Sequence, residues 1–99
     1  MKEYKINLTD QFLEELDSSL YFFSSYMNRR KWYKDVRNIV SSLSFFPERY
    51  GQINKNLKAE KIRKLPINKF VIIYKVDNEN DDVYVLHIFS QNQDYLNEI

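Results

Sequence analysis

The sequence predicts an α+β fold, with an N-terminal strand, an antiparallel helical hairpin and then a three-stranded antiparallel meander that completes one twisted sheet. Three observations predict it. A short stretch of alternating apolar and polar residues comes first, two stretches with apolar residues three and four apart follow, and the last third is rich in β-branched and aromatic residues. A chain of 99 residues is long enough for one core and too short for two, so we expect a single domain over residues 1–99.

The first element is a strand over residues 4–8, where alternation places Tyr4, Ile6 and Leu8 on one buried face. Thr9 then offers an N-cap, because its hydroxyl can accept a hydrogen bond from a free amide of the next turn. The apolar residues that follow share one helical stripe: Leu13, Leu16, Leu20, Phe23 and Met27. We therefore expect a core-facing helix that runs to a break near Asn28.

A second helix is predicted by another set of apolar residues that share a face: Trp32, Val36, Ile39, Val40 and Leu43. Its cations lie mostly elsewhere: Arg29, Arg30, Lys34 and Arg37. We interpret these cations as a solvated surface. The helix should end by Phe46, because Pro47 restricts the residue before it and cannot continue the hydrogen-bond ladder.

The last third of the chain predicts three strands. The second strand of the protein should cover residues 61–65, with Pro66 at its exit and Asn68 in a turn. Residues 70–76 and 83–89 should pair as a hairpin across the polar connector 77–82. With the helical hairpin on one face of the sheet, we expect the other face to remain open to partners.

Composition excludes several classes of function. Fifteen Lys and Arg against 14 Asp and Glu leave a net charge of +1, so overall charge does not indicate nucleic-acid binding. There is no cysteine and only one histidine, and no phosphate-binding or dinucleotide motif, so we expect neither a metal nor a cofactor. No apolar run approaches the ~20 residues that span a bilayer, and we expect a cytoplasmic protein without membrane contact.

His87 is the single imidazole and falls inside the last predicted strand, where Val85 and Phe89 should share its face. Two interpretations are open. The side chain is either a structural histidine hydrogen-bonded within the sheet, or a proton-transfer group that works near neutral pH.

Four cations around the second strand of the protein form the best candidate for a phosphate-facing strip: Lys61, Arg63, Lys64 and Lys69. Ammonium and guanidinium groups neutralise backbone phosphate, and guanidinium can bind it bidentately. An ordinary solvated surface explains the same cations equally well. Tyr95 lies beyond the last strand, where it could stack on a base, donate a proton or anchor the C-terminal segment.

Six segments, taken in order, resemble the RelE/ParE superfamily of bacterial toxins. They are Tyr-Lys-Ile-Asn-Leu-Thr at 4–9, Leu-Ser-Phe-Phe-Pro at 43–47, Arg-Lys-Leu-Pro-Ile-Asn-Lys-Phe at 63–70, Tyr-Lys-Val-Asp at 74–77, Val-Tyr-Val-Leu-His-Ile-Phe at 83–89 and Gln-Asp-Tyr at 93–95. The resemblance implies a toxin that inhibits bacterial growth and is encoded beside an antitoxin. The cognate antitoxin would cover the toxin's working face in a hetero-oligomer.

The superfamily has two functional branches, and the resemblance leaves both open. The RelE-like branch cleaves mRNA on the ribosome with basic side chains and, in some relatives, a Glu, a His and a C-terminal Tyr. For this endoribonuclease the resemblance implies catalytic Arg63, His87 and Tyr95 and nucleic-acid-binding Lys61, Lys64 and Lys69.

The ParE-like branch binds DNA gyrase and cleaves nothing itself. Val71 stands where the nuclease branch usually has an arginine, which favours the ParE-like alternative. A degenerate toxin that only binds its antitoxin is a third reading of the same residues.

Overall fold

A computed structural model describes residues 2–52 and 62–92. The elements follow one another as β1 (Lys5–Leu8), α1 (Asp10–Ser19), the 3₁₀ turn η1 (Leu20–Phe22), α2 (Tyr26–Ser41), the 3₁₀ turns η2 (Ser42–Ser44) and η3 (Pro47–Arg49), β2 (Ile62–Ile67), β3 (Phe70–Asp77) and β4 (Asp82–Ser90). The predicted order of strand, two helices and three strands is confirmed.

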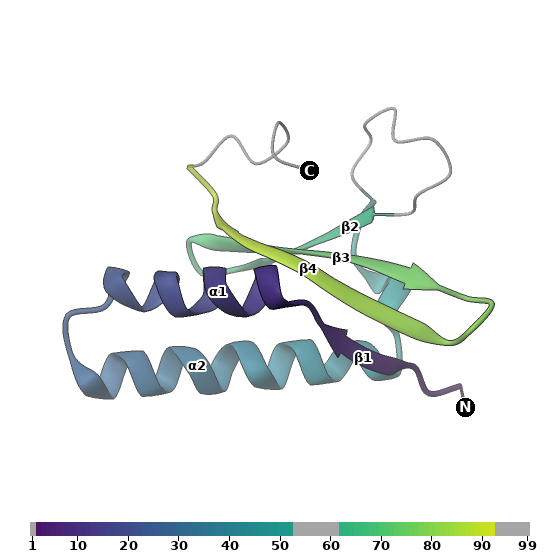
Figure 1. Cartoon of the computed structure of the whole chain (residues 1–99), viewed down its shortest axis with the longest axis horizontal. Coiled ribbons are helices and arrows are strands. Elements are labelled where there is room, and N and C mark those ends of the chain that lie inside the picture. Colours follow the sequence, from purple (N-terminus) through teal and green to yellow (C-terminus); the bar gives the residue numbers. More distant parts are fainter. Residues whose placement is uncertain (1, 53–61, 93–99) are drawn as a thin grey trace.

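The four strands form one sheet in the order β1-β4-β3-β2. The β2, β3 and β4 strands pair antiparallel, which confirms the predicted meander. The first strand pairs parallel with the last, from Lys5 opposite Asp82 to Leu8 opposite Val85. In Figure 1 the twisted sheet lies above the two antiparallel helices, which cover one of its faces.

The first helix is shorter than predicted. It ends at Ser19, and α2 already begins after Ser25, whose side chain accepts a hydrogen bond from the Asn28 amide as an N-cap. The predicted stripe is therefore wrong at its two ends, since Leu13 is 37% exposed and Met27, which belongs to α2, is 73% exposed. A stripe of equal helical spacing, Phe12, Leu16 and Ser19, is buried instead.

Burial of a serine in this stripe has a clear cause. The Ser19 hydroxyl donates to the Leu16 carbonyl and accepts from the indole Nε1 of Trp32 at 2.8 Å. Trp32 is 1% exposed and packs between the rings of Phe23 and Phe70. The pairing satisfies both buried polar groups and joins α1 to α2.

The main core lies between the helices and the sheet. Residues of α1, α2, η2, β2, β3 and β4 contribute to it, together with Tyr4, which lies just before β1. The buried members are Tyr4, Phe12, Leu16, Trp32, Val36, Val40, Leu43, Leu65, Phe70, Ile72, Tyr74, Val83, Val85 and Ile88. Leu8, predicted to be buried, is 47% exposed because it ends a strand at the edge of the sheet. A smaller apolar cluster occupies the opposite face of the sheet: Ile62, Val71, Ile73 and Phe89.

The second strand of the protein also extends further than predicted, to Ile67, and includes Pro66. Because β2 is the outer strand next to β3, a residue without an amide N–H is tolerated there. Asn68 occupies the predicted turn with φ 53°, a left-handed conformation that asparagine adopts more readily than most residues. Neither helix of the described ranges has the length and apolar character that a bilayer crossing requires.

Candidate functional site

A β-bulge in β4 determines where His87 points. Ile73 of β3 is opposite His87, whereas the next residue, Tyr74, is opposite Val85, so Leu86 is an extra residue in β4. Val85 lies in the main core on the helix side, and the extra residue turns His87 to the opposite face, beside Phe89. The expectation that Val85 and Phe89 both share the face of His87 is therefore wrong for Val85.

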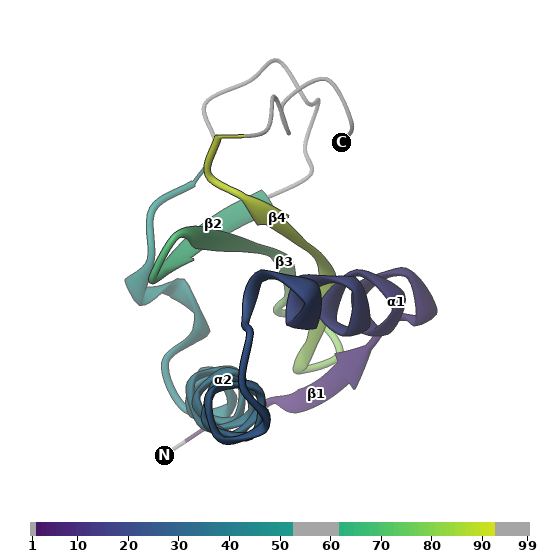
Figure 2. The same ribbon diagram turned by 90° about the vertical axis from the view of Figure 1, so that its left-hand side faces the viewer.

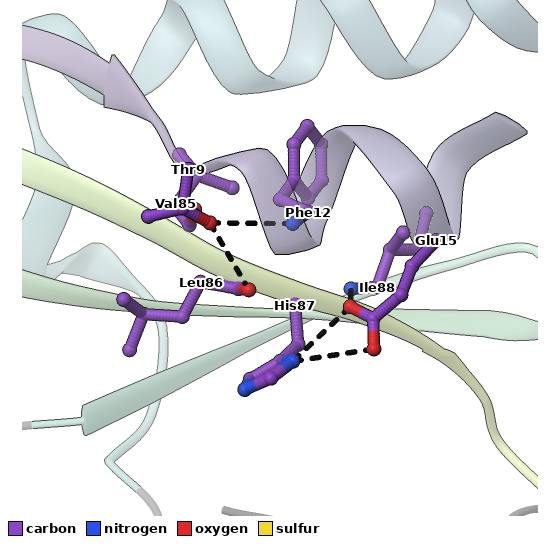
Figure 3. Close-up of polar contacts among 7 residues, drawn as sticks. All are labelled: Thr9, Phe12, Glu15, Val85, Leu86, His87 and Ile88. Carbon is purple, nitrogen blue, oxygen red and sulfur yellow. Dashed lines mark hydrogen bonds and ion pairs between the residues drawn. The ribbon is translucent and has the colours of Figure 1, made fainter.

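Glu15 of α1 meets His87 at the part of the β4 edge that β1 does not cover (Figure 3). The imidazole Nδ1 lies 3.1 Å and 3.3 Å from the two carboxylate oxygens of Glu15. One of these oxygens also accepts the backbone N–H of Ile88 at 3.2 Å. The two side chains are partly enclosed, with His87 22% and Glu15 19% exposed, and the imidazole stacks on the Phe89 ring.

Thr9 places α1 against this edge. Its hydroxyl donates to the carbonyl of Val85 at 2.8 Å and accepts the Phe12 amide at 3.2 Å, so the predicted N-cap is confirmed. The same hydroxyl therefore begins the helix and attaches it to β4. This attachment fixes the distance from α1 to the strand, which is what allows the Glu15 carboxylate to reach His87.

The pair has a defined chemical capacity. A carboxylate at Nδ1 favours the imidazole form that carries a proton on that nitrogen, which leaves the lone pair on Nε2. Within residues 2–52 and 62–92, Nε2 has no hydrogen-bond partner, so the ring can still exchange a proton there. Glu15 was not among the residues predicted for the site, because nothing in a single sequence relates a carboxylate on the first helix to a histidine on the last strand.

Arg63 is not on the same face as His87. It pairs with Tyr74, whose side chain lies in the main core, and its guanidinium donates to the carbonyls of Tyr50 at 2.6 Å and Glu48 at 3.0 Å. It also forms an ion pair with the Glu48 carboxylate at 3.3 Å, and its side chain is only 12% exposed. The predicted catalytic arginine thus holds the segment around η3 against the sheet.

Tyr74 belongs to the same internal cluster. Its hydroxyl donates to the carbonyl of Pro47, and the side chain is fully buried. Burial raises the pKa of Tyr74 from 10.0 to about 12, although the nearby Arg63 guanidinium acts in the opposite direction. Tyr74 therefore remains a neutral hydrogen-bond donor at physiological pH.

Of the other predicted residues, Lys64 lies on the His87 face. It is opposite Ile73, which is opposite His87, so two strand spacings, about 10 Å, separate the backbones of Lys64 and His87. Lys69 is exposed in the turn between β2 and β3, at one end of the sheet. Lys61 and Tyr95 lie outside the described residues.

Lys75 is a further cation on this face that the sequence analysis did not select. Its Nζ lies 5.5 Å from the centre of the Tyr84 ring, and Tyr84 is its cross-strand neighbour. In the described part of the sheet, the face that carries His87 thus has the lysines Lys5, Lys64 and Lys75 and no arginine. The described residues contain no cluster of three metal-ligating side chains.

The fold and the site define a class of protein before any relative is considered. A helical hairpin covers one face of a small mixed sheet, and the other face carries one histidine-carboxylate pair, three lysines and an apolar centre. Such a broad surface with few polar groups is typical of a domain that contacts another macromolecule rather than enclosing a small substrate.

Sequence comparison then identifies the family. A family model described as "ParE toxin of type II toxin-antitoxin system, parDE" matches residues 6–95. Because this match covers most of the chain, the protein belongs to the ParE toxin family and is a toxin of the type II toxin-antitoxin class. No curated protein has a significantly similar sequence.

Solved structures support the fold. The toxin-antitoxin complex RelBE2 from Mycobacterium tuberculosis matches with a TM-score of 0.66 and 17% identity, over 89% of this chain and 98% of that chain. A mutant of the E. coli toxin RelE in the free state matches with a TM-score of 0.63 and 12% identity, over 97% and 92% of the two chains. A chain of the ParDE system of P. aeruginosa matches with a TM-score of 0.59 and 15% identity, over 89% and 96%. The likeness thus extends to structures named for both branches of the superfamily.

Proposed function

We propose that this toxin arrests growth by binding DNA gyrase and that it does not cleave RNA itself. The observation that carries the proposal is the position of Arg63, whose guanidinium is bound to the Glu48 and Tyr50 carbonyls on the helix side of the sheet. Cleavage of RNA through the ribose 2′-hydroxyl needs preorganised cations around the phosphate in the transition state. The match to the ParE family supports the same choice.

The proposal includes a cognate antitoxin as partner and the cytoplasm as the place of action. Related solved structures are named as toxin-antitoxin complexes, which supports an antitoxin for this toxin as well. Gyrase works on the bacterial chromosome, so its inhibitor must reach the cytoplasm. Binding of the antitoxin would then compete with binding of the target.

One paired experiment tests the target. Purified toxin is added to a gyrase supercoiling assay in which cleaved DNA is trapped with detergent, and in parallel to a reconstituted translation reaction whose mRNA is mapped by primer extension. We expect supercoiling to fall and trapped DNA breaks to accumulate, with the mRNA intact. Unaffected gyrase together with mRNA cut on the ribosome would overturn the proposal.

A second candidate function is ribosome-dependent mRNA cleavage, and the Glu15-His87 pair is the observation that favours it. A histidine held by a carboxylate is a common arrangement for acid-base catalysis. Under this alternative His87→Gln lowers cleavage by about 10²-fold or more, the usual contribution of a general acid or base. Under the gyrase proposal the same substitution leaves the inhibition of supercoiling within a few-fold of the wild type.

A further inference from the structure

The outward flank of α2 carries a hollow that neither the predicted fold nor the gyrase proposal requires. It has a volume of about 660 Å³ and is lined by one apolar residue of η1, two tyrosines and four cations: Leu20, Tyr26, Arg29, Arg30, Tyr33, Lys34 and Arg37. We call the four cations and two tyrosines the cationic stripe. No acidic side chain lines the hollow.

The charges of the cationic stripe are largely free. Within the described residues, Arg30, Lys34 and Arg37 have no acidic partner, and Arg29 donates only its Nε, to the carbonyl of Phe23. Lys31 differs, because it is paired with Asp35 at 2.9 Å and does not line the hollow. A surface that was merely solvated would be expected to mix both signs of charge along the helix.

The position of these cations works against the stability of the helix. Arg29 lies at the end of the first turn of α2, where the helix dipole disfavours positive charge, while the last turn has no basic residue. Arg30 and Lys34 are four residues apart, and like charges at this spacing repel. Cations that destabilise their own helix and have no acidic partner in the described residues are typical of a functional surface.

The tyrosines indicate what kind of anion fits. Tyr26 is 73% exposed and Tyr33 is 42% exposed, so both rings are available to a partner beside the cations. Tyr26, Arg30, Tyr33, Lys34 and Arg37 recur at helical spacing and cover about 16 Å along the axis, the rise of roughly five nucleotides of one strand. Aromatic rings that alternate with cations suit unpaired bases and their phosphates.

We propose that the cationic stripe binds single-stranded nucleic acid, with phosphates on the four cations and bases on Tyr26 and Tyr33. Figure 2 shows α2 at the lower left, and no described helix or strand covers its outer flank. An acidic protein segment would satisfy the cations, but it would leave the two exposed rings without a matching group. The surface is distinct from the His87 face of the sheet and does not depend on which target the toxin has.

The test measures binding of the purified full-length toxin to labelled RNA and DNA oligonucleotides of one sequence, about 12 nucleotides long, by fluorescence anisotropy at several salt concentrations. We expect the logarithm of the binding constant to fall with the logarithm of salt with a slope of about −3, as four cations on a single strand imply. Arg30→Gln/Lys34→Gln/Arg37→Gln should weaken binding about ten-fold or more and reduce the slope to about −1. Tyr33→Leu should weaken it about five-fold through lost stacking.

Lys31→Gln is the matched control, since it removes the same charge as Lys34→Gln from the same helix but outside the hollow. The proposal requires Lys34→Gln to weaken binding and Lys31→Gln to leave it near the wild type. It is overturned if the two variants bind alike, if the triple variant binds as well as the wild type, or if the toxin binds poly-L-glutamate and neither oligonucleotide. The RNA and DNA arms show which nucleic acid is bound, and none of these results alters the supercoiling assay.

Discussion

Two charged residues at opposite sides of the sheet bind the protein's own backbone. They differ in whether a functional group nearby stays available to a partner. On β2, Arg63 donates to the carbonyls of Glu48 and Tyr50 and is 12% exposed. Beside β4, Glu15 accepts the Ile88 amide and also holds His87, whose side chain is 22% exposed. Both residues fasten a neighbouring segment, but only the β4 side leaves a titratable atom, Nε2 of His87, without a partner in the described residues.

Whether a charged side chain can bind a ligand thus depends more on the groups that already bind it than on its residue type. Arg63 has the chemistry of a phosphate-binding residue, yet its fork of donors is occupied by carbonyls. One buried N–H of this guanidinium, Nε, stays unpaired in the described residues, which lowers the net gain from enclosing it. Three predictions test the contrast between these two sides of the sheet.

The largest effect is expected for Arg63→Met. Removing the guanidinium leaves the two carbonyls and the Glu48 carboxylate without their donor, which should lower the free energy of unfolding by about 3 kcal/mol. Urea denaturation monitored by circular dichroism measures the change. Lys64→Met is the control, since Lys64 is exposed on the other face of the same strand and should cost less than about 0.5 kcal/mol. Equal losses in the two variants would contradict the role given to Arg63.

A smaller effect is expected from pH on the β2 side. The pKa of Tyr74 is about 12 in the folded protein and 10.0 in the unfolded reference, so the unfolded chain releases the phenol proton first. Stability from this group is complete below pH 10 and is lost as pH rises toward 12, by at most about 2.7 kcal/mol. The measurement is unfolding across this range in the wild type and in Tyr74→Phe, which should lack this part of the pH dependence. Parallel curves for the two proteins would exclude the effect.

The smallest effect is expected on the β4 side. Glu15→Ala removes the acceptor of the Ile88 amide and the partner of His87, and should cost about 1 kcal/mol, because both groups can turn to water. Glu15→Gln keeps an acceptor and should recover most of that loss. Glu14→Ala, which changes an exposed neighbour, serves as the control in the same denaturation assay. A loss as large as that of Arg63→Met would remove the contrast between the two sides.

Much of the fold followed from periodicity. The inward face of α2 at Trp32, Val36 and Val40 and the hairpin of β3 and β4 were predicted because their patterns extend over several turns or residues. The end of α1 was not predicted correctly, because the stripe through Leu13 and the buried stripe through Phe12 have the same helical spacing. Buried Ser19, which binds Trp32, separates the two stripes only in three dimensions.

The candidate site was less predictable for two physical reasons. Adjacent residues of a strand face opposite sides, so the inward position of Arg63 and the outward position of Lys64 depend on register, which an edge strand does not reveal in its sequence. The bulge at Leu86 then reverses the faces of β4 by one residue and turns His87 away from the core. Glu15 could not be found at all, because its role depends on where α1 is attached to β4.

The parallel pairing of the first and last strands has a consequence for biosynthesis. Residues Lys5–Leu8 can gain their neighbours only after Asp82 to Val85 have left the ribosome, so the four-stranded sheet cannot close while its last strand is still being made. Contacts between such distant segments form late and slowly during folding. The N-terminal strand of a nascent chain therefore has no partner in the sheet until β4 has emerged.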